Sequence, residues 1–464
     1  HREGFVSVEH LKRYTTLGMG TDQGRTSNIN GLAIMAGLRN ENIPTVGTTT
    51  FRPPFSPIPL NAIAGKERGR HFAPIRRTPM HEWHVKNGAS FVPAGQWLRS
   101  QYYPDKKEKM WDAILREARN VRENVGIADV SPLGKIDLQG QDSVEFLNRL
   151  YINSFDTLPV GKSRYGVMLR EDGHVFDDGT VTHINNNHFM ITTTTVNAAA
   201  VLGHMEYWSQ IEWPELDVRF MSVTDEWAGI AIAGPESRVL LKQVISGLDL
   251  QNESFPFMAF GNCQVSGVPA RLFRISFSGE LAYELNVPAN YGLKIWDKLA
   301  KLGVDKNIMP YGMEAMSILR IEKGHVVGSE LNGRTTPLDL GFGNMMSKKK
   351  DFLGKRALNR EGMSGDNRGQ LIGLYPQNKV SPIPGGAQII ERPTLSEKFS
   401  VIGEVTSAAR SPNMGHPIGL GLVQNGRNRL GEIVSIASPV TGHSFDVVLC
   451  NPVFFDPEGK RLHD

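Results

Sequence analysis

Cysteine is scarce in this chain, whose 464 residues include two, Cys263 and Cys450. The two lie far apart and show no paired spacing, so a cysteine zinc site is not expected. Cys263 lies in the strand-like stretch "NCQVSGV", which predicts a buried thiol. Few cysteines, together with a charged start that does not look like an export signal, favour a cytoplasmic location.

Long apolar runs and a large net charge are also lacking. No apolar run is long enough to cross a bilayer, and a net charge of +3 over this length indicates no nucleic-acid partner. The 13 histidines show no metal-binding spacing, because "HEWH" (81–84) is not H-E-x-x-H. No complete G-x-G-x-x-G or G-x-x-x-x-G-K-[ST] occurs either. The sequence therefore predicts no membrane span, no metal site and no phosphate loop of the usual kind.

The residues that are present divide the chain into three parts. Residues 1–105 begin with helix-like sequence and continue through Gly-, Pro- and aromatic-rich stretches of little periodicity, which predicts an irregular arm packed on another segment or subunit. Residues 106–365 alternate strand and helix patterns and predict an α+β domain with antiparallel sheets. Residues 366–464 carry short strands between turns and predict a small C-terminal β-barrel. Because the chain starts with His and its first segment already looks helical, we expect it to be part of a longer or processed polypeptide.

An acidic pair, Asp177 and Asp178, stands out in "REDGHVFDDGTV" (170–181). The pattern predicts two strands joined by a turn at "EDG", with the pair on the second strand. Successive strand residues face opposite sides, so one of the two carboxylates points inward if the strand packs on a core. A buried carboxylate needs a partner or a function. The alternative is an acidic pair on a solvated strand end.

Two further acidic stretches allow more than one interpretation. Glu280 and Glu284 in "SFSGELAYELNV" (276–287) could share one face of a strand, or Glu280 could belong to a turn and Glu284 be an exposed strand residue. Arg320 and Glu322 could form a surface ion pair of little energetic value. Residues alone thus predict a multidomain protein with a candidate acidic pocket.

Taken together, several stretches support a family resemblance. Residues 106–464 resemble the tetrahydrofolate-dependent aminomethyltransferase family, which includes the T-protein of the glycine cleavage system. The resemblance rests on motifs that occur in the same order, among them "GIADVSPLGKIDLQGQDSVEFLNRL", "RYGVMLREDGHVFDDG", "FRISFSGELAYELNVPANYG", "PYGMEAMSILRIEKG" and "GEVTSAARSPNMGHPIGLGLV". The arm is similar to that of the alpha subunit of heterotetrameric sarcosine oxidase, through "EHLKRYTTLGMGTDQGRTSN", "IPTVGTTTFRPP" and "LRSQYYP".

The resemblance implies a function and a set of site residues. The chain would transfer the one-carbon unit of an oxidised N-methylglycine iminium to tetrahydrofolate, giving 5,10-methylenetetrahydrofolate and glycine. Asp177 would be the catalytic carboxylate beside the folate, and Glu284 would accept hydrogen bonds from the pterin ring. Phe277 would stand where the T-protein has a pocket tyrosine, and Met316 about where it has an arginine. Asp178 would face the other way and have a structural role. Tyr283 should alternate to the face opposite Glu284 and is not counted among the site residues.

The same resemblance implies cofactors and partners. FMN would lie at a subunit interface and FAD in a flavin-containing beta subunit, with small subunits completing a hetero-oligomer. NAD would bind only through an N-terminal region missing from this chain. Two alternatives remain: a non-catalytic scaffold subunit of the oxidase, for which Phe277 and Met316 are the reason, and a stand-alone folate-dependent aminomethyl- or methyltransferase.

Overall fold

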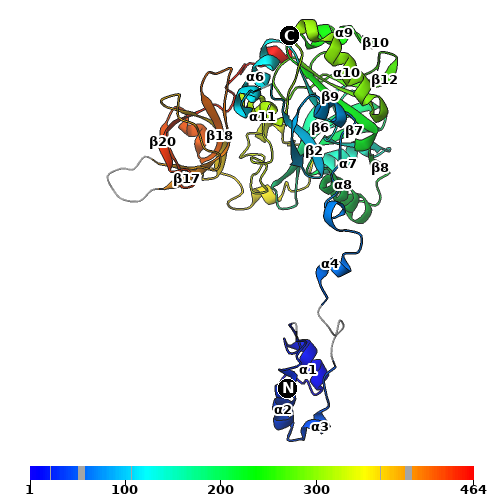
Figure 1. Cartoon of the computed structure of the whole chain (residues 1–464), viewed down its shortest axis with the longest axis vertical. Helices are drawn as coiled ribbons and strands as arrows, with labels where there is room; N and C mark the ends of the chain where they lie inside the picture. Colours follow the sequence, from blue (N-terminus) through cyan, green and yellow to red (C-terminus); the bar gives the residue numbers. More distant parts are fainter. Residues whose placement is uncertain (21, 51–57, 106, 366, 392–399) are drawn as a thin grey trace. The chain divides into compact units, whose positions relative to one another are not determined.

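The computed structural model describes residues 1–20, 22–50, 58–105, 107–365, 367–391 and 400–464. The chain divides into two compact units, His1–Pro74 and Ile75–Asp464 (Figure 1). The stretch 51–57, which carries the predicted "FRPPFSP" segment of the arm, lies outside the described residues. No helix in the described part of the chain is both long and apolar enough to cross a membrane.

The first unit is a small group of helices. Its elements are α1 (Val8–Tyr14), α2 (Asn28–Arg39), α3 (Ile43–Val46), α4 (Leu60–Ile63) and the 3-10 turn Gly69–His71. The apolar side chains of Val8, Leu32, Met35, Ala36 and Val46 form its core. The helical start agrees with the helix-like sequence at the beginning of the chain. Asn40 ends α2 in the left-handed conformation, with φ of 55°, which is a common helix terminator.

Residues 75–105 belong to the second unit, which differs from the expected arm of 1–105. They form α5 (His81–Lys86) and a hairpin of β1 (Ser90–Ala94) and β2 (Trp97–Tyr102). Met80, Trp97 and Tyr103 are buried there. The stretch looked unable to fill a core because its apolar residues lack periodicity. These side chains nevertheless pack individually, without forming a periodic face, against elements that come later in the chain.

Two sheets form the centre of the second unit. The five-stranded sheet has the order β5-β6-β7-β4-β8, and the seven-stranded sheet has the order β10-β11-β12-β13-β9-β3-β14. Their strands are β3 (Gly126–Asp129), β4 (Gly134–Gln139), β5 (Ser163–Leu169), β6 (Val175–Asn185), β7 (His188–Thr193), β8 (Arg219–Ser222), β9 (Trp227–Ala233), β10 (Ile245–Ser246), β11 (Phe260–Val265), β12 (Val268–Phe273), β13 (Ala282–Pro288) and β14 (Met309–Pro310). All pairings are antiparallel except that of β14 with β3. The predicted α+β class is confirmed.

Helices pack on both sheets and each begins near a turn. They are α6 (Met110–Glu123), α7 (Ser143–Leu150), α8 (Ala198–Tyr207), α9 (Ser237–Lys242), α10 (Gly292–Leu302) and α11 (Met313–Glu322). Asp142 precedes α7 but makes no side-chain cap, and its carboxylate instead accepts the backbone N–H of Asp217 at 2.8 Å. Cys263 is a buried free thiol on β11, as the sequence predicted.

The C-terminal strands close into the predicted barrel, in the order β15-β18-β17-β16-β19-β20. Their bounds are β15 (Gly369–Pro376), β16 (Gln388–Ile390), β17 (Val401–Arg410), β18 (Pro417–Gln424), β19 (Ile433–Ser438) and β20 (His443–Cys450). Its interior holds aliphatic side chains such as Ile372, Ile389 and Val447. Figure 1 shows α11 on the side of the sheets that faces this barrel, and α11 contacts both β17 and β18.

A buried ionic network joins the barrel to the rest of the unit. Arg122 of α6 pairs with Glu280 at 2.9 Å and with Glu322 of α11 at 2.7 Å. Arg461, after the barrel, pairs with Glu280 at 2.9 Å. Arg320 pairs separately with Glu330 at 3.1 Å. The interpretation of Arg320 and Glu322 as a surface pair is therefore wrong, because both are buried and each has its own distant partner.

Candidate functional site

Strand β6 positions Asp177, which shares the buried face of the strand with Val175. Its carboxylate accepts hydrogen bonds from the Thr194 hydroxyl (2.6 Å), the Thr194 backbone N–H (3.2 Å) and the Asn197 amide (3.1 Å). Asp177 is 2% exposed. Burial raises the pKa of this carboxyl, and the three hydrogen bonds oppose the rise. Asp177 is therefore the inward-facing member of the pair, with a proton affinity above that of an ordinary aspartate.

Asp178 points to the opposite face of the same strand. The hydroxyl of Tyr165, on the neighbouring strand β5, donates a hydrogen bond to it at 2.7 Å. Burial raises the pKa of Asp178 to about 7, with the hydrogen bond from Tyr165 opposing the rise and the charge of Asp177 adding to it. The two adjacent carboxylates thus occupy different surroundings, as strand alternation predicted.

Glu284 lies on β13, between β12 and β9, and is 7% exposed. The interpretation of Glu284 as an exposed strand residue is therefore wrong. Asn286 lies two residues further on the same face, and its amide donates a long hydrogen bond of 3.5 Å. Burial raises the pKa of Glu284, while the charge of Lys135 lowers it. Tyr283 faces the other way, where its hydroxyl accepts a hydrogen bond from Arg238 at 3.0 Å.

Lys135 is a buried cation whose charge acts on Glu284, and sequence reasoning missed it. It lies on β4, and its ammonium donates to the carbonyls of Ser131 and Leu133, each at 3.1 Å. Burial lowers the pKa of Lys135 to about 8, against the attraction of Glu284 and Asp129. Successive residues of a strand face opposite sides, so an interpretation of the sequence that places the apolar Ile136 on the buried face of β4 places Lys135 on the solvated face. That face is covered because Arg271 of β12 reaches across to Asp137 of β4.

His84 ties the segment before the sheets to the same region. Its Nε2 lies 3.0 Å from Asp129 of β3, and its Nδ1 lies 2.9 Å from the Tyr103 hydroxyl. The edge of the ring meets Trp296, with ring centroids 4.9 Å apart. Although burial opposes it, the hydrogen bond to His84 holds the pKa of Asp129 below its ordinary value. These buried contacts fix the position of β3 and of the loop after it, whose Ser131 and Leu133 carbonyls accept hydrogen bonds from Lys135.

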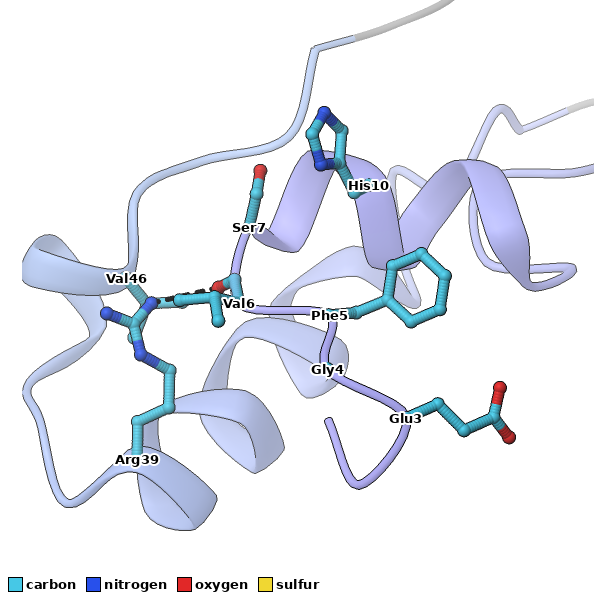
Figure 2. A pocket seen from close by; sticks show the side chains of 8 residues that line it. All are labelled: Glu3, Gly4, Phe5, Val6, Ser7, His10, Arg39 and Val46. Atoms are coloured by element: carbon cyan, nitrogen blue, oxygen red, sulfur yellow. Dashed lines mark hydrogen bonds between the residues drawn. The ribbon is translucent and has the colours of Figure 1, made fainter.

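Two surface hollows lie away from these carboxylates. One of about 590 Å³ lies in the first unit and is lined by residues 3–7, His10, Arg39 and Val46. Figure 2 shows Arg39 crossing it to donate to the Val6 carbonyl, at 3.0 Å. Another of about 200 Å³ lies beside Arg77, Trp97, Asp225 and Trp227. None of the predicted site residues lines either pocket. Within the described residues, no group of three or more His, Cys, Asp or Glu side chains could hold a metal ion.

Comparison with known proteins identifies the family to which this chain belongs. Residues 80–350 match the family model described as the GCVT N-terminal domain, and residues 370–456 match the glycine cleavage T-protein C-terminal barrel domain. The chain belongs to the glycine cleavage T-protein family. A solved member, aminomethyltransferase T from Bartonella henselae, is 25% identical with a TM-score of 0.70, over 82% of this chain and 99% of that one.

Sarcosine oxidase alpha subunits share more of this chain. Residues 1–66 match the sarcosine oxidase A3 domain. Sarcosine oxidase subunit alpha from Rhizobium meliloti is 50% identical over 100% of this chain and 47% of its own length, and that from Corynebacterium sp. (strain P-1) is 44% identical over 99% and 48%. An aminomethyltransferase from Thermotoga neapolitana is 30% identical over 75% of this chain and 90% of its own. The chain therefore spans about half the length of the sarcosine oxidase subunits that it matches.

The predicted site residues come from different elements, and no described hydrogen bond joins them directly. Asp177 lies on the five-stranded sheet and Glu284 on the seven-stranded sheet. Phe277 lies in the loop before β13, is 42% exposed, and has its ring centroid 5.7 Å from that of His325. Met316 is half-buried on α11. The two buried carboxylates thus have well-defined surroundings, whereas Phe277 stands at the surface.

Proposed function

We propose that this chain is the part of a sarcosine oxidase-like alpha subunit that holds tetrahydrofolate and captures a one-carbon unit. The donor would be the iminium formed when N-methylglycine is oxidised, and the products would be 5,10-methylenetetrahydrofolate and glycine. The observation that carries the proposal is Asp177, a carboxylate 2% exposed and held by three hydrogen bonds. Membership of the T-protein family supports the choice of folate.

The residues present fit a reduced folate. The pterin ring offers an amino group and a ring N–H side by side, and the two oxygens of a carboxylate accept such a pair. Glu284 is a buried carboxylate whose protein donor, Asn286, is 3.5 Å away, so it has capacity for further donors. Phe277 would form the outer wall of the site. Tetrahydrofolate supplies the nucleophilic amine that takes up the donor carbon.

Asp177 would move the protons that this exchange requires. The two folate nitrogens that bond to the iminium carbon each lose a proton, and the glycine nitrogen gains both protons as its bond to that carbon breaks and it leaves as an ammonium group. A carboxylate whose pKa is raised by burial can accept the first proton and return it to the leaving nitrogen. Its negative charge also stabilises the cationic carbon before capture.

The proposal includes partners that this chain does not contain. Flavin chemistry must generate the iminium, so a flavin-containing beta subunit with FAD, small subunits, and FMN at a subunit interface are proposed alongside it. An NAD site would belong to a segment outside this sequence. The proposal rests here on the similarity to sarcosine oxidase alpha subunits over the whole chain.

The test uses the assembled oxidase with the Asp177→Asn variant of this chain. Flavin reduction by N-methylglycine should be unchanged, while 5,10-methylenetetrahydrofolate formation falls by about 10²- to 10⁴-fold and free formaldehyde appears instead. Asp178→Asn, with its side chain on the opposite face, is the matched control and should keep most of the transfer. Near wild-type transfer by Asp177→Asn would remove the assigned role. Absence of tetrahydrofolate binding at millimolar concentration would favour a scaffold subunit.

A further inference from the structure

Arg99 is a half-buried cation for which the described residues supply no carboxylate at salt-bridge distance, although the charge of Asp129 acts on it from further away. It lies on β2, and no carboxylate among the described residues lies within 4 Å of its guanidinium. Its Nη1 makes one long contact, 3.5 Å from the Thr195 hydroxyl, and its buried Nε makes no hydrogen bond to any described residue. By contrast, the buried Arg122 and Arg320 each pair with carboxylates at about the ideal distance. A guanidinium stays charged in proteins, so an unpaired one is costly unless it receives an anion.

The position of Arg99 places it near both predicted binding residues. Thr195 follows Thr194, whose backbone N–H and hydroxyl hold Asp177. The charge of Arg99 also lowers the pKa of Lys135, on which the charge of Glu284 acts in the opposite sense. Arg99 therefore lies where the surroundings of Asp177 and of Glu284 meet, with its free N–H groups available there.

The donor in the proposed function carries a negatively charged carboxylate, which neither Asp177 nor Glu284 can bind. Both the oxidised N-methylglycine and the released glycine bear a carboxylate next to the reacting nitrogen. A carboxylate accepts two parallel N–H bonds from a guanidinium fork, the geometry that Arg supplies and Lys does not. Asp177 and Glu284 would both repel it, so a cation beside them is needed to hold the amino-acid end of the donor.

We propose that Arg99 binds the carboxylate of the amino-acid portion of the one-carbon donor and of the glycine product, an inference that rests on the proposed function. The guanidinium holds that end of the molecule so that the reacting nitrogen and carbon lie beside Asp177. Arg99 is then a specificity residue for donors that carry an α-carboxylate.

The test compares glycine with glycinamide, which has the same size but no carboxylate. Each is titrated calorimetrically into the full chain, with and without saturating tetrahydrofolate. Glycine should bind at least about tenfold more tightly than glycinamide, and Arg99→Gln should reduce glycine affinity to the glycinamide level while leaving tetrahydrofolate affinity within about twofold. Arg99→Lys, which keeps the charge without the fork, should fall between. Arg76→Gln, which removes a guanidinium paired with Asp225 at a more exposed position, is the control and should change neither titration.

Each result separates this inference from the proposed function. If Arg99→Gln weakens tetrahydrofolate binding and leaves glycine unchanged, Arg99 contacts the folate instead and the inference is overturned. If wild type binds glycine and glycinamide equally, it is also overturned, while saturable folate binding leaves the proposed function standing. If tetrahydrofolate does not bind but glycine binding depends on Arg99, the folate proposal fails and the carboxylate site remains. Unfolding midpoints of the variants show whether any loss reflects misfolding.

Discussion

Thr194 holds Asp177 with two hydrogen bonds, one to each carboxylate oxygen: its hydroxyl donates to Oδ1 at 2.6 Å and its backbone N–H donates to Oδ2 at 3.2 Å. Thr194 directly follows β7, which lies beside β6 in the sheet, so this contact joins the end of β7 to the neighbouring strand. The carboxylate plane is therefore fixed by the sheet. A base held in this way needs no reorganisation when it accepts a proton.

Thr194→Val should alter the pH dependence of one-carbon transfer. The change removes the hydroxyl donor but keeps the side-chain shape and the backbone N–H. Because that hydrogen bond lowers the pKa of Asp177, its loss should raise the pKa further and move the acidic limb of the rate profile to higher pH. Thr192→Val removes a hydroxyl that bonds to Thr180 instead, and should leave the limb in place. An unmoved limb in Thr194→Val would show that Asp177 is not the titrating base.

Glu284→Gln should weaken tetrahydrofolate binding by about 10- to 100-fold, since hydrogen bonds to a charged group contribute about 1.5 to 3 kcal/mol. The variant keeps the shape but replaces an acceptor oxygen with a donor amide. Calorimetric titration measures the affinity directly. Glu404→Gln on the barrel strand β17 is an exposed control of the same chemistry and should bind normally. Equal affinity in both variants would exclude Glu284 from the folate site.

Asp178→Asn should stabilise the protein more at pH 8 than at pH 5. Burial raises the folded-state pKa of Asp178 to about 7 from the ordinary 3.8, so the folded state binds the proton more tightly than the unfolded state. Stability from this group is present below pH 4 and is lost as pH rises through 7. Asparagine does not titrate and so removes that loss. The stabilisation by Asp178→Asn, measured as unfolding free energy, should therefore be about 3 kcal/mol larger at pH 8 than at pH 5. Urea unfolding at both pH values measures it, and equal effects at both would contradict the assigned pKa.

Gly312→Ala should destabilise the second unit by about 3 kcal/mol or more, because overpacking at rigid backbone cannot be relieved by a rotamer change. Gly312 precedes α11, and an added Cβ would lie 2.0 Å from the carbonyl oxygen of Gln101 on β2. Gly203 lies on α8 with open space around it, so Gly203→Ala should instead stabilise by up to about 1 kcal/mol. Urea unfolding of both variants gives the comparison. Similar stabilities would mean that β2 does not pack against the start of α11.

Local sequence patterns predicted much of the fold and the acidic residues of the candidate site, but not its cations. Strand alternation was enough to show that one of Asp177 and Asp178 faces inward, and short strands between turns predicted the barrel. Lys135 and Arg99 were missed because they look like ordinary polar strand residues until another sheet or helix covers them. The burial of Arg99 had a sequence signal, because strand alternation puts it on the same face as Trp97. The burial of Arg122 had one too, because it lies four residues after Ala118 on the same face of α6.

The partners of buried charges could not be predicted from sequence. Residues two apart on a helix do not face each other, so Arg320 and Glu322 were never suited to pair. Their real partners lie in a loop, in α6 and near the barrel, and only the packed unit brings these together. The extent of the arm was misjudged for the same reason. Its aromatic residues contact elements far along the chain and leave no periodic trace.

On a translating ribosome, Glu280 emerges long before Arg461, which lies 181 residues further along the chain. Strands of both sheets can pair as they are made, and Arg122 is already present to neutralise part of the charge around Glu280 and Glu322. The second guanidinium arrives only after every strand of the barrel has been synthesised. The nascent chain must therefore wait for the residues that follow the barrel before the region between α6 and α11 is sealed. Co-translational folding of residues 75–464 therefore includes a closing step that joins Arg461 to Glu280, and these residues cannot fold strictly one domain after another.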